Sequence, residues 1–245
     1  MVNKPLFFSL VLSYILITSQ NSEGQHRFEI DISFGYSRPL LEAYGTNVKL
    51  SPAQDYVLID GKRLIESNNF GTDIGYTFQL LGKYSFLKGY LKGLLNLGYN
   101  RLYSIFPGPG DDFGIKLQSF SFGAGLEVNP LVNHRIYPSI FGLLRYNLIG
   151  GESFHHAGLD FFKVSSRFGY SAGLKLNYSI NKKIGLFTGW SYNYDNLWNK
   201  KTNEEGQLDA HVIPLRDEKS PTNGLNNDRR VAYSSYYFGI SFYLK

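Results

Sequence analysis

The sequence predicts an all-β fold: an eight-stranded antiparallel up-and-down transmembrane β-barrel over residues 25–245, with long extracellular loops and short periplasmic turns. Three observations lead to this prediction. Tyr and Phe, which favour strands, each occur 19 times. Segments of 12 or more residues alternate apolar with polar or small side chains, as strands with two unlike faces do. The connections between these segments alternate long and short, which is typical of barrels that cross a membrane.

The N-terminus predicts export. Lys4 precedes the uncharged apolar run 5–17, and the small residues Ser22 and Gly24 then stand at the −3 and −1 positions of a cleavage site. These are the three parts of a secretory signal peptide, which we assign to residues 1–24. An N-terminal membrane anchor is the alternative, but the run is shorter than the roughly 20 apolar residues of a spanning helix. We therefore expect a cleaved signal peptide and a location in the cell outer membrane.

The first strand, 28–40, has the clearest alternation. Its even positions from Phe28 to Tyr36 are all apolar, and its odd positions from Glu29 to Ser37 are all polar or small. Seven further segments follow this pattern, although Leu94, Phe141 and Leu143 fall on the polar faces of theirs. The eight expected strands are 28–40, 70–83, 90–103, 117–128, 136–148, 165–180, 184–195 and 231–244.

The connections are as informative as the strands. Long and short ones alternate, and an even number of strands places the start of the first strand and the end of the last strand on the short-turn side. Inside the first long loop, Asp60-Gly61 between two apolar runs predicts a type I′ hairpin. The expected connections are 41–69, 84–89, 104–116, 129–135, 149–164, 181–183 and 196–230.

The charges in mid-strand determine which face points where. Full charges are costly against lipid, whereas inside a narrow eight-stranded barrel they can pair with one another. Four acids and four bases share the polar faces, so we expect a neutral lumen network and no open pore; the alternative is that these charges lie near the rims and are solvated. The expected network is Glu29, Asp31, Asp73, Lys92, Glu127, Arg145, Arg167 and Lys175.

The last strand, 231–244, is expected to pair with 28–40 and close the barrel, because an open strand edge is not tolerated in a bilayer. Its alternate apolar side chains would face lipid, with Tyr243 filling space on the inner side. The residues that we assign to this C-terminal assembly strand are Tyr236, Phe238, Ile240, Phe242 and Tyr243.

One loop contains residue types found in hydrolytic sites. The segment 151–158 holds Glu152, Ser153, His155 and His156. Adjacent histidines in an extended chain point to opposite sides, and the loop offers no third metal ligand, so a solvated loop is the better interpretation. We predict no catalytic, cofactor or metal site. The absence of Cys excludes thiol chemistry, and the dispersed charge of +5 gives no nucleic-acid footprint.

With its signal peptide, eight amphipathic strands, alternating loops and aromatic last strand, the chain resembles the small outer-membrane β-barrel proteins, the OmpX/OmpA-like "porin family" grouping that includes PorT-like proteins. The resemblance implies outer-membrane lipid and the barrel-assembly machinery, which reads the last strand, as partners. A non-enzymatic scaffold or docking subunit, holding other envelope proteins through loops 41–69 and 196–230, is the first functional hypothesis. A narrow channel for ions or small solutes and a lipid- or peptide-hydrolysing enzyme are the alternatives.

Overall fold

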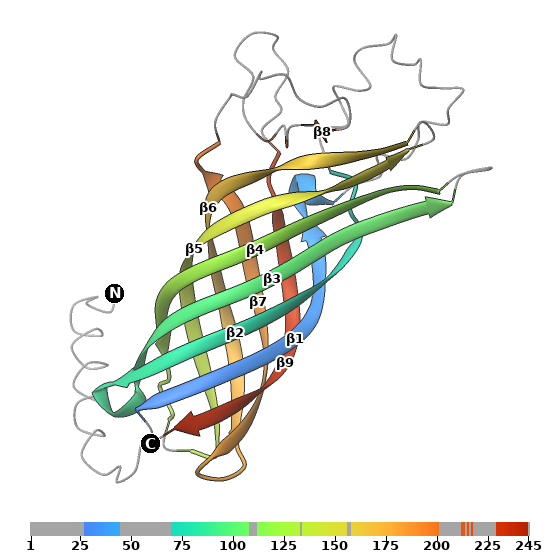
Figure 1. The fold of residues 1–245 in the computed structure, drawn as a ribbon. Coiled ribbons are helices and arrows are strands. Elements are labelled where there is room, and N and C mark those ends of the chain that lie inside the picture. Colours follow the sequence, from blue (N-terminus) through green and yellow to red (C-terminus); the bar gives the residue numbers. More distant parts are fainter. Residues whose placement is uncertain are drawn as a thin grey trace, which may run out of the picture.

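The computed structural model shows a closed antiparallel barrel (Figure 1). It describes residues 27–44, 70–107, 112–132, 134–155, 158–200, 212–213, 215, 217 and 229–244. Two 3₁₀ turns, η1 (Leu41–Ala43) and η4 (Leu87–Gly89), accompany the strands. The strands are β1 (Phe28–Leu40), β2 (Ile74–Phe86), β3 (Leu91–Pro107), β4 (Asp112–Val128), β5 (Ile136–His155), β6 (Gly158–Ser179), β7 (Ile184–Trp198), β8 (Val212–Ile213) and β9 (Ala232–Leu244). Eight of these strands form the barrel, and the two-residue β8 pairs in parallel with β6.

Two expectations lie outside these described ranges: the signal peptide at 1–24 and the hairpin at Asp60-Gly61, so both stay predictions. Within the described ranges, no helix has the length and hydropathy needed to cross a membrane.

Pairing between the last strand and the first closes the barrel, as the sequence predicts. β9 pairs with β1 from Phe28↔Leu244 to Leu40↔Ala232, and its other edge pairs with β7. The two strands approach closely at Gly35, where an added Cβ would clash with the carbonyl oxygen of Tyr236. β1 therefore begins and β9 ends at the same end of the barrel (Figure 1). We call this the turn end, since it also carries connections 87–90, 129–135 and 180–183, and the opposite end the loop end.

The strands towards the loop end are longer than the sequence pattern predicts. The expected loop 104–116 is mostly ladder, because β3 and β4 stay paired up to Pro107↔Asp112. The expected loop 149–164 is likewise a hairpin, paired up to His155↔Gly158 with an irregularity between Ile149 and Gly151. In both hairpins, residues that the sequence assigns to the loop continue the backbone hydrogen bonding. Figure 1 shows β3 to β6 extending beyond the rest of the barrel.

The outer face is apolar, as a bilayer requires. Leu95 and Leu144 are 70% and 66% exposed, and aliphatic side chains so exposed are stable against hydrocarbon. At the turn end, the rings of Phe28 and Tyr84 are 5.1 Å apart. Towards the loop end, outer rings lie 4.8–6.2 Å apart in the pairs Phe34–Tyr76, Tyr76–Tyr99, Tyr99–Phe120 and Tyr146–Phe168. Aromatic residues at both ends of an apolar band form the girdles of a transmembrane barrel.

Truncation after Tyr237 tests the closure. The deleted residues pair with Phe28–Phe34, the half of β1 near the turn end, on one side and with Ile184–Thr188 on the other. Their loss leaves two unpaired backbone edges at membrane depth, so no folded barrel should form in lipid vesicles. Heat-modifiable migration in gel electrophoresis measures folding. Phe238→Leu, which keeps the strand and its apolar outer face, should fold normally; normal assembly of the truncated chain would contradict the assignment of β9.

Candidate functional site: a closed polar lumen

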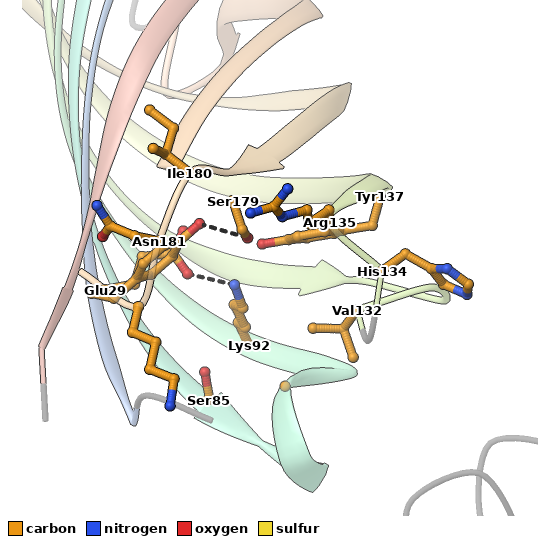
Figure 2. Close-up of a pocket in the computed structure, with 13 residues that line it drawn as sticks. Glu29, Ser85, Lys92, Val132, His134, Arg135, Tyr137, Ser179, Ile180 and Asn181 are labelled. Atoms are coloured by element: carbon orange, nitrogen blue, oxygen red, sulfur yellow. Dashed lines mark hydrogen bonds and ion pairs between the residues drawn. The ribbon is translucent and has the colours of Figure 1, made fainter. Parts of the chain in front are cut away.

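A pocket of about 490 Å³ opens at the turn end of the barrel. Turns 129–135 and 180–183 contribute to its walls, and Figure 2 shows Arg135 and Tyr137 beside it. Glu29 and Lys92, which are joined by an ion pair and almost fully buried, line it on the lumen side. The pocket therefore leads from the turn end to a cluster of charges.

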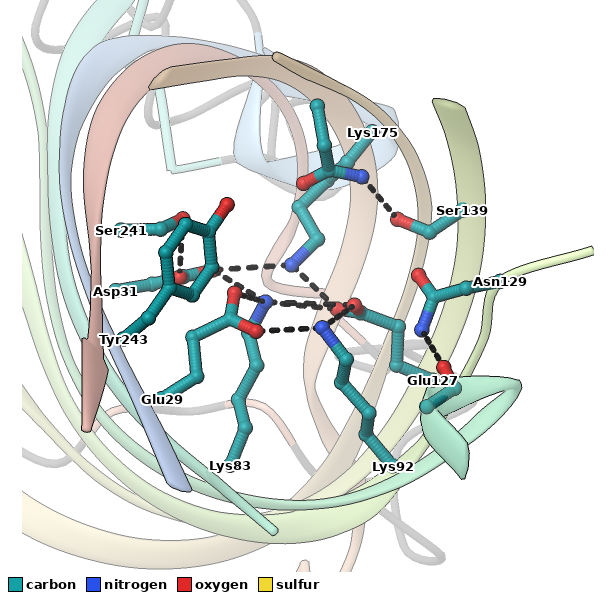
Figure 3. Close-up of polar contacts among 12 residues, drawn as sticks. Glu29, Asp31, Lys83, Lys92, Glu127, Asn129, Ser139, Lys175, Ser241 and Tyr243 are labelled. Carbon is teal, nitrogen blue, oxygen red and sulfur yellow. Dashed lines mark hydrogen bonds and ion pairs between the residues drawn. The ribbon is translucent and has the colours of Figure 1, made fainter. Parts of the chain in front are cut away.

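Six charged side chains form this lumen charge cluster (Figure 3). They come from the inner faces of β1, β2, β3, β4 and β6, and each side chain is at most 5% exposed. The strand period of two explains their position, because each belongs to the set of residues whose side chains point away from lipid. The members are Glu29, Asp31, Lys83, Lys92, Glu127 and Lys175.

Lys83 contacts all three acids. Its Nζ is 2.9 Å from Glu29 Oε1, 2.6 Å from Asp31 Oδ2 and 3.2 Å from Glu127 Oε2. A single ammonium therefore joins carboxylates from β1 and β4, on different walls of the lumen. Because a buried charge is tolerated only when it is paired, Lys83 is the residue on which the three acids jointly depend.

The other two lysines complete the charge balance. Lys92 Nζ lies 2.5 Å from Glu29 Oε2, and Lys175 Nζ lies 3.1 Å from Asp31 Oδ2 and also pairs with Glu127. Ser241 donates a further hydrogen bond of 2.7 Å to Asp31 Oδ1. Three carboxylates and three ammonium groups give a net charge of zero, so the cluster can be buried without a counter-ion.

A cluster of buried apolar side chains adjoins these charges. Lys175 Nζ lies 5.7 Å and 5.3 Å from the ring centroids of Phe141 and Phe187, within range of a cation–π interaction. Leu94, Phe141 and Leu143, which the sequence places on the polar faces of their strands, belong to this cluster and fill the lumen. The cluster consists of Leu81, Leu94, Phe141, Leu143, Phe187 and Tyr237.

A second ion pair crosses the lumen between β5 and β7. Arg145 binds the Asp195 carboxylate, and its Nη1 donates to Asn193 Oδ1 at 3.2 Å. Its Nη2 also donates to the Tyr233 hydroxyl at 3.2 Å, and Tyr233 donates to Asp195 Oδ2 at 3.3 Å. Asn147 Nδ2 donates to the Asp195 backbone oxygen at 2.7 Å. The guanidinium is therefore held by groups from two strands, β7 and β9, and Asn147 of β5 fixes the backbone of Asp195.

A third ion pair ties the last long connection to the barrel. Arg167 binds Asp217 through two parallel hydrogen bonds, Nε to Oδ2 at 2.9 Å and Nη2 to Oδ1 at 2.7 Å. Asn196 Nδ2 donates to the same carboxylate at 2.8 Å. Such bidentate pairing fixes orientation as well as distance, so Asp217 has a defined place against β6.

A cluster of buried apolar residues lies at the loop end. The rings of Phe70 and Phe162 meet edge to face at 6.5 Å. The group joins residues of both long connections to the barrel wall. We call it the loop-end apolar cluster: Ala43, Phe70, Leu102, Leu117, Ile149, Phe162, Leu215, Val231 and Tyr233.

Beside the loop-end apolar cluster, an ion pair joins Glu42, at the start of the first long connection, to Arg230, at the end of the last one. Arg230 Nε and Nη2 donate to the two Glu42 carboxylate oxygens, each at 2.5 Å. The Arg230 backbone N–H adds a bond of 3.3 Å. Partial burial acts to raise the pKa of the Glu42 carboxyl, but the hydrogen bonds and charge of Arg230 outweigh it and lower this pKa.

The structure brings together five of the eight charges that the sequence predicts as one network: Glu29, Asp31, Lys92, Glu127 and Lys175. Arg145 and Arg167 are also buried but have their own partners.

Asp73 corrects the prediction. It is exposed and precedes β2, which begins at Ile74 and not at residue 70. Its backbone N–H bonds to the Tyr103 carbonyl oxygen at 3.2 Å, so the chain is only entering the ladder there and the side chain has not reached the lumen.

Lys83 is the most important residue that the sequence prediction omitted. The expected strand ends at this residue, and the sequence prediction counts its charge with the solvated short turn that follows. β2 continues to Phe86, so Lys83, two residues after the inward Leu81, points into the lumen within a paired strand. The alternation of outward Tyr84 and Phe86 around Ser85 is the signal that could have found it.

Two acids were also omitted, for different reasons. Asp195 follows Ser191 and Asn193 on the inner face of β7, so periodicity was enough to find it. Asp217 belongs to the long connection 196–230, where no strand period operates, and the sequence offers no signal for its pairing.

The segment with hydrolase-like residues forms part of the β5–β6 hairpin. The Glu152 carboxylate lies 3.3 Å from Lys116 Nζ. The side chains of Ser153 and His155, and the whole of His156, lie outside the described part of the structure. Among the described residues, no group of three His, Cys, Asp or Glu could hold a metal ion.

Replacement of Lys83 tests the charge cluster. Lys83→Met keeps the length of the side chain but leaves three acids with two bases, so it should destabilise the barrel by about 3–5 kcal/mol. Unfolding by guanidinium in phosphatidylcholine vesicles, which carry no anionic lipid, measures this change. Lys88→Met, in the adjacent exposed turn, should change stability by no more than about 0.5 kcal/mol. Equal effects of the two substitutions would contradict the pairing.

Solved structures similar to this chain are small outer-membrane barrels. Neisserial surface protein A matches at 14% identity and a TM-score of 0.47, over 91% of this chain and 100% of its own. Ail, the attachment invasion locus protein of Yersinia pestis, matches at 12% and 0.44, over 89% and 98%. The outer membrane protein OprG from Pseudomonas aeruginosa matches at 12% and 0.43, over 91% and 98%. No family model and no curated protein matches the sequence. The strand pairing of the chain itself establishes the eight-stranded barrel, and its exposed apolar outer face suits a bilayer, so the resemblance seen in the sequence is confirmed at the level of the fold.

Proposed function

We propose that this protein is a closed barrel of the Gram-negative outer membrane that acts without catalysis, as a scaffold or docking subunit for other envelope proteins. The lumen charge cluster is the observation that carries the proposal. Its six side chains extend from several walls of the lumen and are nearly inaccessible to water. Tightly paired, dry charges support a structural role for the interior.

The loop end supports docking. The long connections 41–73 and 199–231 are fixed where they leave the barrel, by the loop-end apolar cluster and by the Glu42–Arg230 ion pair. Binding sites are commonly loops held by a rigid scaffold. The hydrolase alternative receives no such support, because the Glu152 carboxylate is engaged with Lys116.

Co-purification tests the docking role. The full chain and a variant in which 45–69, 201–211 and 218–228 are replaced by short Gly-Ser linkers, with Leu215 and Asp217 kept, are purified from envelopes in mild detergent. The full chain should retain defined envelope proteins, and the variant should lose them while keeping heat-modifiable migration. Identical partners for both, or no partner for the full chain, would contradict docking through these connections.

Conductance in planar bilayers separates the scaffold from the channel. A lumen filled by a dry, paired cluster should give no steady current, because ions would have to displace these charges from one another. A reconstituted general porin serves as the positive control in the same bilayer. A steady, large, ohmic conductance of the purified protein would favour the channel.

The pH dependence of stability tests the Glu42–Arg230 anchor. Since the folded pKa of Glu42 lies below its ordinary 4.5, its contribution is present above that value and is lost as the pH falls through the folded pKa. The pair is partly exposed and screened, so Glu42→Gln should cost only about 0.2–1 kcal/mol at pH 7. Wild type and Glu42→Gln should converge in acid. An equal difference at pH 7 and pH 3 in denaturant unfolding would contradict the role of the ion pair.

A further inference from the structure

The turn end presents a rim of exposed positive charge. Its members come from the residue before β1 and from the three turns that join β2 to β3, β4 to β5 and β6 to β7, so they are distributed around the whole perimeter. None of them takes part in an ion pair with another described residue. We call them the rim cations: Arg27, Lys88, Arg135, Lys182 and Lys183.

Among the described residues of the turn end, no exposed carboxylate offsets these charges. The turns 84–90, 129–135 and 180–183 contain no Asp or Glu. The acids nearest in the strands, Glu29 and Glu127, are buried in the lumen and already neutralised by lysines. Because these buried acids are already paired, the described part of the rim has an excess of positive charge.

The rim cations border hydrocarbon-facing side chains. Four of the five are adjacent in sequence to a large apolar residue that is exposed on the outer face. These residues stand at the strand ends, where the apolar band stops, and long flexible basic side chains there can reach the polar headgroup layer. The adjacent pairs are Arg27–Phe28, Leu87–Lys88, Arg135–Ile136 and Lys183–Ile184.

We propose that the rim cations bind the phosphate headgroups of anionic phospholipids in the leaflet around the turn end. An acidic protein would need a cationic patch on one surface, whereas these charges are spread around the barrel end. Arg135 and Lys182 also line the turn-end pocket, while Arg27, Lys88 and Lys183 stand beside exposed apolar residues at the strand ends. Basic side chains at a membrane surface are attracted to anionic lipids in this way. The proposal depends on the membrane-spanning barrel and not on the docking of envelope proteins.

The outer wall beside one rim cation has room for a lipid chain. A mostly apolar groove of about 440 Å³ includes Gly82 and Gly93. The groove lies close to the β2–β3 turn. Gly93 pairs with Tyr84, and the next outward pair, Phe86↔Leu91, borders that turn. No heavy atom lies within 4 Å of the place where a Cβ of Gly82 would be. An acyl chain of a lipid bound at Lys88 can lie in this groove.

Lipid titration of the purified full chain in neutral detergent tests the proposal. Phosphatidylglycerol and phosphatidylcholine with the same acyl chains are added, bound lipids are counted by native mass spectrometry, and thermal unfolding is followed by heat-modifiable migration. Phosphatidylglycerol should bind more tightly and raise the unfolding midpoint further. At low salt, each removed charge should weaken its binding by about fivefold. The variant K88Q/R135Q/K182Q/K183Q should therefore lose the preference.

Arg38→Gln is the matched control, because Arg38 is an exposed base on β1 towards the loop end. This variant should keep the preference for phosphatidylglycerol. Equal binding of the two lipids by wild type, or an unchanged preference in the quadruple variant, overturns the proposal. Binding of polyglutamate without any lipid preference also overturns it, in favour of an acidic protein partner. If the quadruple variant does not fold, K182Q/K183Q is measured under the same criteria.

Discussion

Charge balance inside a narrow barrel is the constraint on which this structure depends. Eight strands enclose a lumen that side chains must fill, and every second residue of each strand points into it. Lys83 illustrates the consequence, because it contacts Glu29, Asp31 and Glu127 at once. Acids on β1 and β4 therefore have partners on β2, β3 and β6, so a slip of one residue in any of these strands would leave a buried charge without its partner.

The same constraint shapes both ends of the molecule. Inside, the charge cluster, the apolar side chains around Phe141 and the Arg145–Asp195 pair fill successive regions of the lumen. At the loop end, apolar residues and the Arg167–Asp217 pair bind the long connections to the barrel. At the turn end, the described acids lie inside the lumen, and the exposed charges of the described residues are bases. The interior thus stabilises the fold, while the two rims are left to interact with other molecules.

The barrel could be predicted from the sequence because its physical cause is local. Alternation in β1 identifies every inward residue, and the bounds of that strand agree with the expectation. The strand ends follow less well from the sequence. The Pro- and Gly-rich run FPGPGDD (106–112) indicates a turn, but β3 and β4 stay paired up to Pro107↔Asp112. Lys83 was missed because β2 was ended too early. Asp217 could not be found at all, because its pairing with Arg167 depends on how a long connection folds back.

The central claim, that the lumen is closed by paired and dry side chains, can be tested directly because the chain contains no cysteine. Ser191→Cys places a single thiol at a fully buried position on the inner face of β7, and Asn181→Cys places one in an exposed turn. Each variant is reconstituted in vesicles and treated with a charged thiol reagent on both sides of the membrane. Our account predicts rapid labelling at position 181 and none at 191 until the protein is unfolded; equally rapid labelling of both would contradict it.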